Sequence, residues 1–149
     1  MKEFIYTMLI VLIVLCSNVY TANKNYGDIC YAAYVKNYDG DTITFNIPNI
    51  HPLFGKLISV RLSGVDTPEI RGSKCAKEKE LAYKAKVFVK NLLTGAEKIE
   101  LKNVGRGKYF RILADIHVDG INLAELLIKN NFAIRYYGGK KEKDWCNGN

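Results

Sequence analysis

Alternation of apolar and polar residues predicts five β-strands in this chain. The segment 57–63 alternates cleanly, placing three apolar side chains on one face and Arg61 on the other. Asp39-Gly40 is a strong signal for a hairpin turn between two strands. The remaining predicted strands are residues 30–38, 41–47, 96–104 and 109–118.

A helical period replaces this alternation in two segments. Residues 76–93 carry apolar side chains at spacings of four, three and four, which is one face of an α-helix. A shorter helix is predicted over 123–131, with Asn122 as its N-cap and Glu125 completing a capping-box-like pair. Two prolines in the segment 48–56 argue against regular structure there. The residues expected on the buried face of the first helix are Leu81, Ala85, Phe88 and Leu92.

The order of these elements is three strands, a helix, two strands and a helix. This β-β-β-α-β-β-α order fits the α+β class and, within it, a five-stranded OB-fold barrel with two helices. Such barrels frequently bind oligonucleotides. A fold does not establish a function, however, so the function has to be inferred from a site.

The N-terminus has the character of a targeting segment. Lys2 precedes an apolar run over residues 4–15, which matches a signal-peptide core and is short for a membrane span of about 20 residues. We therefore expect residues 1–22 to be a signal peptide or N-terminal anchor and residues 23–149 to form one domain. Cleavage near Thr21 or Ala22 would give an exported protein, secreted or periplasmic. The alternative is a protein anchored to the membrane through an uncleaved segment.

The composition is basic, with 22 Lys and Arg against 15 Asp and Glu, a net charge of +7 and an isoelectric point near 9.2. This balance suits nucleic acid or an anionic membrane as a partner, although it can also serve solubility alone. The N-terminal segment contains one basic and one acidic residue, so its removal leaves the net charge unchanged.

Three cysteines would remain after export: Cys30, Cys75 and Cys146. An oxidising compartment would permit one disulfide and one spare thiol. The spacing does not fix the pair, but we favour Cys75 with Cys146, which would fasten the C-terminal tail. The sequence has no CxxC motif and no histidine-rich cluster, so a zinc site is not expected.

Four short stretches carry candidate chemistry: Asp39-Gly40-Asp41-Thr42, Arg61, Asp66-Thr67-Pro68-Glu69 and Lys108-Tyr109-Phe110-Arg111. Each alone has an ordinary explanation as a turn or a solvated strand face. An EF-hand starting at Asp39 is excluded, because its twelfth position is Ile50 instead of glutamate.

Together the four stretches supply what phosphodiester hydrolysis needs. Asp41 and Asp66 could provide oxygen ligands for Ca²⁺. Glu69 could accept a proton from water or hold that water in place. Two arginines, Arg61 and Arg111, could each bind a phosphate through paired N–H donors of the guanidinium, which lysine cannot do equally well. The further residues that could bind the nucleotide are Tyr109 and Tyr137.

With these motifs the chain resembles the staphylococcal nuclease (thermonuclease) family from about residue 30 to residue 145. The resemblance is carried by DGDT at 39–42, RLSGVDTPE at 61–69, the helix that follows, KYFRILAD at 108–115 and DGINLAELLIKNNFA at 119–133. It implies a Ca²⁺-dependent endonuclease acting on DNA and RNA, with single strands preferred. The products would be a 3′-phosphate and a 5′-hydroxyl. We expect a monomer without an obligate protein partner.

The resemblance also assigns roles by position. Arg61, Glu69 and Arg111 fall on the family's catalytic residues. The metal ligands would be Asp41, Asp66 and the backbone carbonyl of Thr67. The substrate-binding residues would be Lys108, Tyr109 and Tyr137, with Tyr136 as the alternative to Tyr137.

Two features depart from the family pattern. Phe110 stands where the family has glycine, and a polar tail over 138–149 replaces a C-terminal helix. The alternative function is a non-catalytic OB-fold module that binds nucleic acid or another partner. That alternative does not explain why all three catalytic positions are present, since binding-only members of the family tend to lose them.

Overall fold

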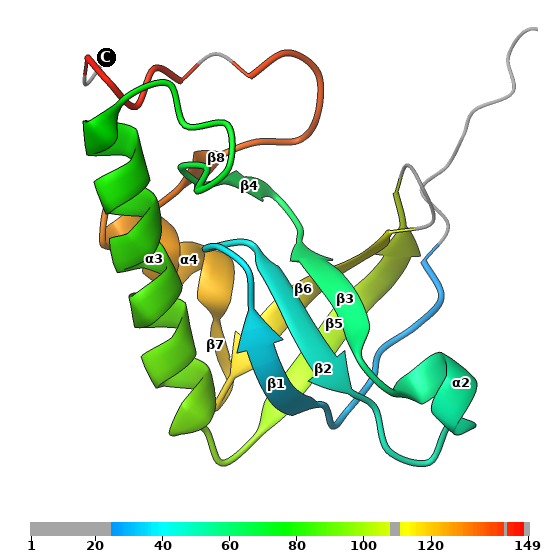
Figure 1. Cartoon of the computed structure of the whole chain (residues 1–149). Coiled ribbons are helices and arrows are strands. Elements are labelled where there is room, and N and C mark those ends of the chain that lie inside the picture. Colours follow the sequence, from blue (N-terminus) through cyan, green and yellow to red (C-terminus); the bar gives the residue numbers. More distant parts are fainter. Residues whose placement is uncertain (1–24, 108–110, 142, 148–149) are drawn as a thin grey trace, which may run out of the picture.

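The computed structural model describes residues 25–107, 111–141 and 143–147, which form a mixed sheet with helices packed beside it (Figure 1). The main sheet has the order β1-β2-β3-β6-β5, and β7 extends it by pairing with β6. Every pair in this sheet is antiparallel except β3 with β6, which is parallel. The strands of this sheet are β1 (Ala33–Asn37), β2 (Thr42–Asn46), β3 (Ile58–Leu62), β5 (Ile99–Arg106), β6 (Ile112–Val118) and β7 (Ile121–Asn122).

A second, two-stranded sheet lies beyond the end of β3. It pairs β4 (Val65–Asp66) with β8 (Ile134–Arg135) in antiparallel fashion. The long helix α3 (Ala76–Thr94) runs along one side of the main sheet, and α4 (Leu123–Lys129) follows β7 (Figure 1). The one-turn helix α2 (Pro52–Gly55) lies at the opposite end of the molecule from β4 and β8.

Alternation places one face of each central strand in the core. On β3, Val60 and Leu62 are buried while Arg61 between them is only partly exposed. Because side chains of a strand alternate between its two faces, the same residues that fill the core aim Arg61 away from it. The largest buried side chains are Ile43, Phe45, Leu62, Leu101, Ile116, Leu123 and Leu127.

The predicted α+β class, the five long strands and both helices are confirmed, with shifted ends. A closed barrel would require β1 to pair with β5, and the described residues contain no such pairing. The segment before β1 instead contacts β5 through backbone hydrogen bonds between Ile29 and Leu101 and from Ala32 N–H to the Ile99 carbonyl.

The expectation of no regular structure over 48–56 is wrong, because Pro52 begins the short helix α2. His51 caps this turn by accepting the Leu53 N–H, and proline is favoured in the first helical turn, where its missing N–H costs nothing.

The buried face of α3 is also shifted by one residue from the expected one, except at Ala85. Its centre is formed by Ala82, Ala85, Val89 and Leu93.

The expected signal peptide or anchor, residues 1–22, lies outside the described residues. Within the part of the chain that the structure describes, no helix is long and apolar enough to cross a membrane.

Candidate active site

The hairpin between β1 and β2 packs directly against the loop that follows β4. The Asp39 carboxylate accepts the backbone N–H groups of Asp41 and Thr42 at 3.2 and 2.8 Å, which closes the turn. A Cβ added to Gly40 would lie 3.0 Å from Thr67 Cγ2 and 3.1 Å from Ala85 Cβ. Glycine is therefore needed here for close approach, and this contact brings the DGDT and DTPE motifs together.

The loop after β4 is fastened to the first turn of α3 by a buried carboxylate. Glu78 is 4% exposed and accepts the backbone N–H groups of Glu69 at 3.4 Å and Lys74 at 2.7 Å. A buried acceptor that serves two backbone donors restrains both. Glu78 thus holds the backbone of Glu69 in place, a role that the sequence analysis did not assign.

Asp41 lies at the centre of the site, with its carboxylate almost fully buried. Arg61 Nη1 lies 2.5 Å from Asp41 Oδ1, and the hydroxyls of Thr42 and Thr67 donate to the two carboxylate oxygens at 3.1 and 3.0 Å. Burial raises the pKa of Asp41 to about 7, and the nearby Asp39 charge adds to this effect, while Arg61 and the two hydroxyls act in the opposite direction. Loss of Arg61 would therefore leave a buried carboxylate without its cationic partner.

Asp66 is buried beside Asp41, on the other side of the same guanidinium. Arg61 Nη2 lies 3.7 Å from Asp66 Oδ1, so Arg61 faces both aspartates. The same oxygen lies 2.6 Å from Lys141 Nζ, yet no hydrogen bond of acceptable geometry reaches it from the described residues. Asp66 thus has cations close by and an oxygen whose hydrogen-bonding capacity is unused.

This donor set fits a hard divalent cation. Carboxylate and carbonyl oxygens are the ligands that Ca²⁺ prefers. The buried Asp66 Oδ1 accepts no hydrogen bond from the described residues, so none would have to break for it to bind a cation. No group of three or more Asp, Glu, His or Cys side chains in the described segments is arranged to hold a metal. A cation here would therefore depend on Asp41 and Asp66 with neutral oxygens, such as the Thr67 carbonyl and water.

A cavity of about 360 Å³ is lined by Arg61, whose guanidinium lies close to both aspartates. Arg61, Glu69 and Arg111 all line it, so three predicted catalytic residues from distant parts of the sequence share one hollow. The parallel pairing of β3 with β6 brings the two arginines together, because it sets Val60 beside Ile112 and Arg61 beside Leu113, and Arg111 immediately precedes β6. The other residues that line the cavity are Gly107, Leu113, Tyr136 and Lys141.

A neighbouring hollow of about 270 Å³ shares Arg61, Leu113 and Tyr136 with the first. Tyr137 lines only this second hollow and is 84% exposed. Tyr136 lines both, and its N–H donates to the Gly64 carbonyl at 3.0 Å. Tyr136 is therefore the tyrosine closer to the arginines, whereas Tyr137 stands at the rim.

The predicted substrate-binding residues Lys108 and Tyr109 lie outside the described residues, as does Phe110. Gly107 and Arg111 on either side are described, and the Gly107 N–H donates to the Arg111 carbonyl at 2.8 Å.

The C-terminal tail contributes a residue to the site that the sequence analysis missed. Lys141 lines the cavity, and its ammonium lies 2.6 Å from both Asp66 Oδ1 and Glu69 Oε1. Partial burial lowers the pKa of Lys141, but its close contacts with Asp66 and Glu69 and the charges of these carboxylates outweigh burial and raise it. The favoured disulfide between Cys75 and Cys146 is present, and Cys30 is a free, exposed thiol.

Known proteins share sequence similarity with this chain. The staphylococcal nuclease homologue family matches residues 59–146. An uncharacterized protein of Methanocaldococcus jannaschii is 31% identical over 149 aligned residues, covering 85% of this chain and 69% of the relative. An uncharacterized protein of Bacillus anthracis is 34% identical over 101 residues, covering 66% of this chain and 44% of the relative. Since the family match spans more than half of the sequence, the chain belongs to the staphylococcal nuclease homologue family.

Proposed function

We propose that this protein is a Ca²⁺-dependent nuclease that hydrolyses phosphodiester bonds of DNA and RNA, leaving 3′-phosphate and 5′-hydroxyl ends. The observation that carries the proposal is the cavity that Arg61, Glu69 and Arg111 share beside two buried aspartates. Membership of the nuclease homologue family supports the same reaction class.

The two arginines would bind the scissile phosphate. Guanidinium groups offer paired N–H donors that match phosphate oxygens, and charge that develops on those oxygens during attack would be stabilised by both. Arg61 is held by the Asp41 carboxylate, so one donor is already oriented by the fold. Arg111 is exposed, and it is the arginine free to approach a substrate from the side of solvent.

Glu69 would act on the attacking water. Its carboxylate is partly exposed and lines the cavity, while its backbone N–H is restrained by Glu78. As the water oxygen bonds to phosphorus, its proton passes to Glu69, and the bond to the 5′-oxygen breaks. That oxygen takes a proton from solvent, which gives the 5′-hydroxyl and leaves the phosphate on the 3′ side.

The cation would be held by Asp41, Asp66 and the Thr67 carbonyl. When bound, Ca²⁺ supplies positive charge for the phosphoryl oxygens and a place for water.

The substrate is proposed to be single-stranded nucleic acid, because the open cavity is bordered by Tyr136 and Tyr137, whose rings can stack on unpaired bases. The net charge of +7 favours a polyanion. Lys108 and Tyr109 are proposed to contact the phosphate. Further parts of the proposal are an OB-type arrangement of the sheet, export of the mature chain, and action as a monomer.

The test is digestion of denatured DNA with Ca²⁺ present and then with a chelator. The matched variants are Arg111→Ala, in the cavity, and Arg135→Ala, an exposed arginine whose ion partner is Glu125. We expect cleavage that requires Ca²⁺ and falls about a hundredfold or more in Arg111→Ala, because it loses a donor to the transition state. Arg135→Ala should keep full activity.

Cleavage that persists in chelator, or that is absent under both conditions, would contradict the proposal. Binding of single-stranded DNA without Ca²⁺ and without cleavage would favour the non-catalytic module instead. End-labelling of the products distinguishes a 3′-phosphate from a 3′-hydroxyl.

A further inference from the structure

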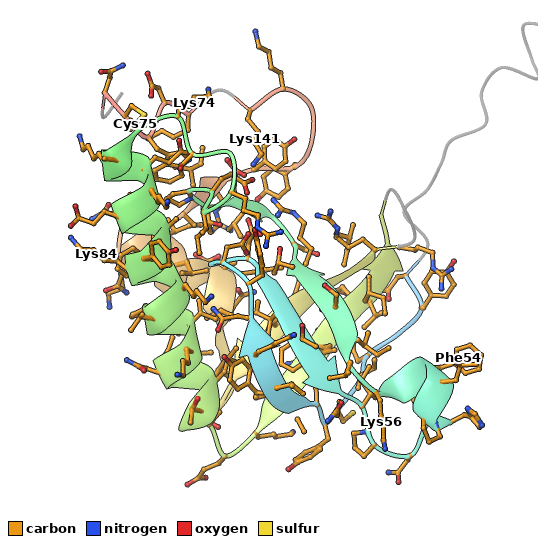
Figure 2. All side chains as sticks on the ribbon, in the orientation of Figure 1. Phe54, Lys56, Lys74, Cys75, Lys84 and Lys141 are labelled. Carbon is orange, nitrogen blue, oxygen red and sulfur yellow. A yellow bond between two sulfur atoms is a disulfide. The ribbon has the colours of Figure 1, made fainter. Side chains whose placement is uncertain are left out.

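Lys141 occupies the space between the two carboxylates that matter most to the proposed reaction. Its Nζ lies 2.6 Å from Asp66 Oδ1, a proposed cation ligand, and 2.6 Å from Glu69 Oε1, the proposed base. Figure 2 shows Lys141 beneath the arch of the C-terminal tail, on the side that faces β4 and the following loop. One ammonium thus meets both groups at once.

The Lys141 ammonium lies beside a carboxylate, that of Asp66, which has few other partners. Asp66 Oδ1 is buried and has no hydrogen bond of good geometry, and Arg61 approaches it only to 3.7 Å. A buried carboxylate oxygen without a donor is costly unless a cation is close. Lys141 supplies that charge from a side chain that is itself 42% exposed, so solvent can receive the ammonium if it leaves.

The tail is held so that Lys141 reaches this position. Upstream, the Tyr136 N–H donates to the Gly64 carbonyl and the Tyr136 hydroxyl to the Gly139 carbonyl. Downstream, the disulfide joins Cys146 to Cys75, the N-cap residue of α3. The tail therefore crosses from β8 to the start of α3 over the loop that contains Glu69 (Figure 1).

We propose that Lys141 is an internal cation that competes with the divalent cation for Asp66 while it pairs with Glu69, and that the disulfide-bonded tail holds it there. The inference rests on the proposed function, because it concerns the cation of that same site. A bound divalent cation and the ammonium cannot share the Asp66 oxygen without strong repulsion, so one must displace the other. By holding Lys141 in place, the tail thereby raises the concentration of divalent cation that is needed to occupy the site.

Competition fits the contacts better than a role in binding phosphate. A phosphate-binding lysine would carry an ammonium whose charge is not already matched by carboxylates. Lys141 instead donates to Glu69 and lies against Asp66, so its charge is already matched by two carboxylates. In this position it also engages the carboxylate that would otherwise receive the proton of the attacking water.

The test measures Ca²⁺ affinity directly by titration calorimetry of the disulfide-bonded protein, without any substrate. Lys141→Gln removes the ammonium, and Lys141→Arg keeps a positive charge at the same place. Lys140→Gln is the matched control, since Lys140 is an exposed neighbour in the same tail. Cys146→Ala releases the tail. Thermal unfolding of each variant verifies that it is folded.

We expect Lys141→Gln to bind Ca²⁺ at least about tenfold more tightly than the unmodified protein, because a like charge beside the cation is gone. Lys140→Gln and Lys141→Arg should bind as the unmodified protein does, and Cys146→Ala should change in the same direction as Lys141→Gln. Equal affinities in the unmodified protein and Lys141→Gln would overturn the inference and leave the proposed function intact. Loss of cleavage in Lys141→Gln without a change in affinity would overturn it too, in favour of phosphate binding.

Absence of Ca²⁺ binding in every variant would refute both this inference and the cation requirement of the proposed function. If Lys141→Gln binds Ca²⁺ more tightly but Cys146→Ala binds it as the unmodified protein does, the role of the disulfide is refuted and that of the lysine is retained.

Discussion

Removing the disulfide between Cys75 and Cys146 should destabilise the protein mainly through its unfolded state. The bond joins residues 71 positions apart and so closes a loop that contains α3, β5, β6 and α4. For a loop of this size, the restriction of the unfolded chain gives about 4 kcal/mol at 25 °C. The double variant Cys75→Ser/Cys146→Ser suits the measurement, because serine at position 75 can still accept the Glu78 N–H as an N-cap.

The assay is urea unfolding followed by two signals. Far-ultraviolet circular dichroism reports the whole fold, and fluorescence of Trp145, the single tryptophan, reports the tail beside Cys146. We expect the free energy of unfolding to fall by about 2–4 kcal/mol and the m value to rise, since an unlinked chain exposes more surface when it unfolds. A loss below about 1 kcal/mol with an unchanged m value would refute the reasoning, because the bond would then not be restricting the unfolded chain.

Three further predictions concern the packing that positions the site. Gly40→Ala should cost about 1–3 kcal/mol in urea unfolding, because its Cβ would press on Thr67 and Ala85 at 3.0 and 3.1 Å. Glu78→Gln should also cost about 1–3 kcal/mol, since an amide has one acceptor oxygen for two backbone donors; an unchanged stability would show that these bonds matter little. Phe45→Ala should cost about 3–5 kcal/mol by thermal or urea unfolding, because the ring is fully buried. Its control, Leu53→Ala, should stay within about 0.5 kcal/mol, as Leu53 is 73% exposed.

Local patterns were sufficient to predict the strands and the main helices. Alternation has a period of two along a strand, so Val60 and Leu62 identify the core face of β3 from the sequence alone. The face of α3 is less well predicted: Ala85 is buried as expected, but its centre also includes Ala82, which carries a weaker hydrophobic signal than the neighbouring Leu81. Pro52 was misread as a break, although proline in a first turn starts a helix as readily as it ends one.

The features that the sequence did not reveal are long-range. The pair β4–β8 joins two-residue strands far apart in the chain, and so short a strand has no period to detect. Lys141 looked like one lysine of a solvated tail, because its contacts with Asp66 and Glu69 depend on the path of that tail between β8 and Cys146. The predicted roles of Asp41, Arg61 and Arg111 came from motifs, whereas their meeting at one cavity depends on tertiary pairing.

The parallel pairing of β3 with β6 makes the site dependent on completion of folding. Arg61 and Arg111 are separated by α3 and β5 in the sequence, and they share a cavity only when β6 docks beside β3. Pairing between such distant segments is intrinsically slow, because closing the long intervening loop costs entropy before any contact is gained. A chain still emerging from the ribosome, or one cut between these strands, would hold only one of the two arginines proposed to bind phosphate. Nuclease activity would then report that the last part of the sheet has formed, which an assay of refolding could follow in time alongside fluorescence.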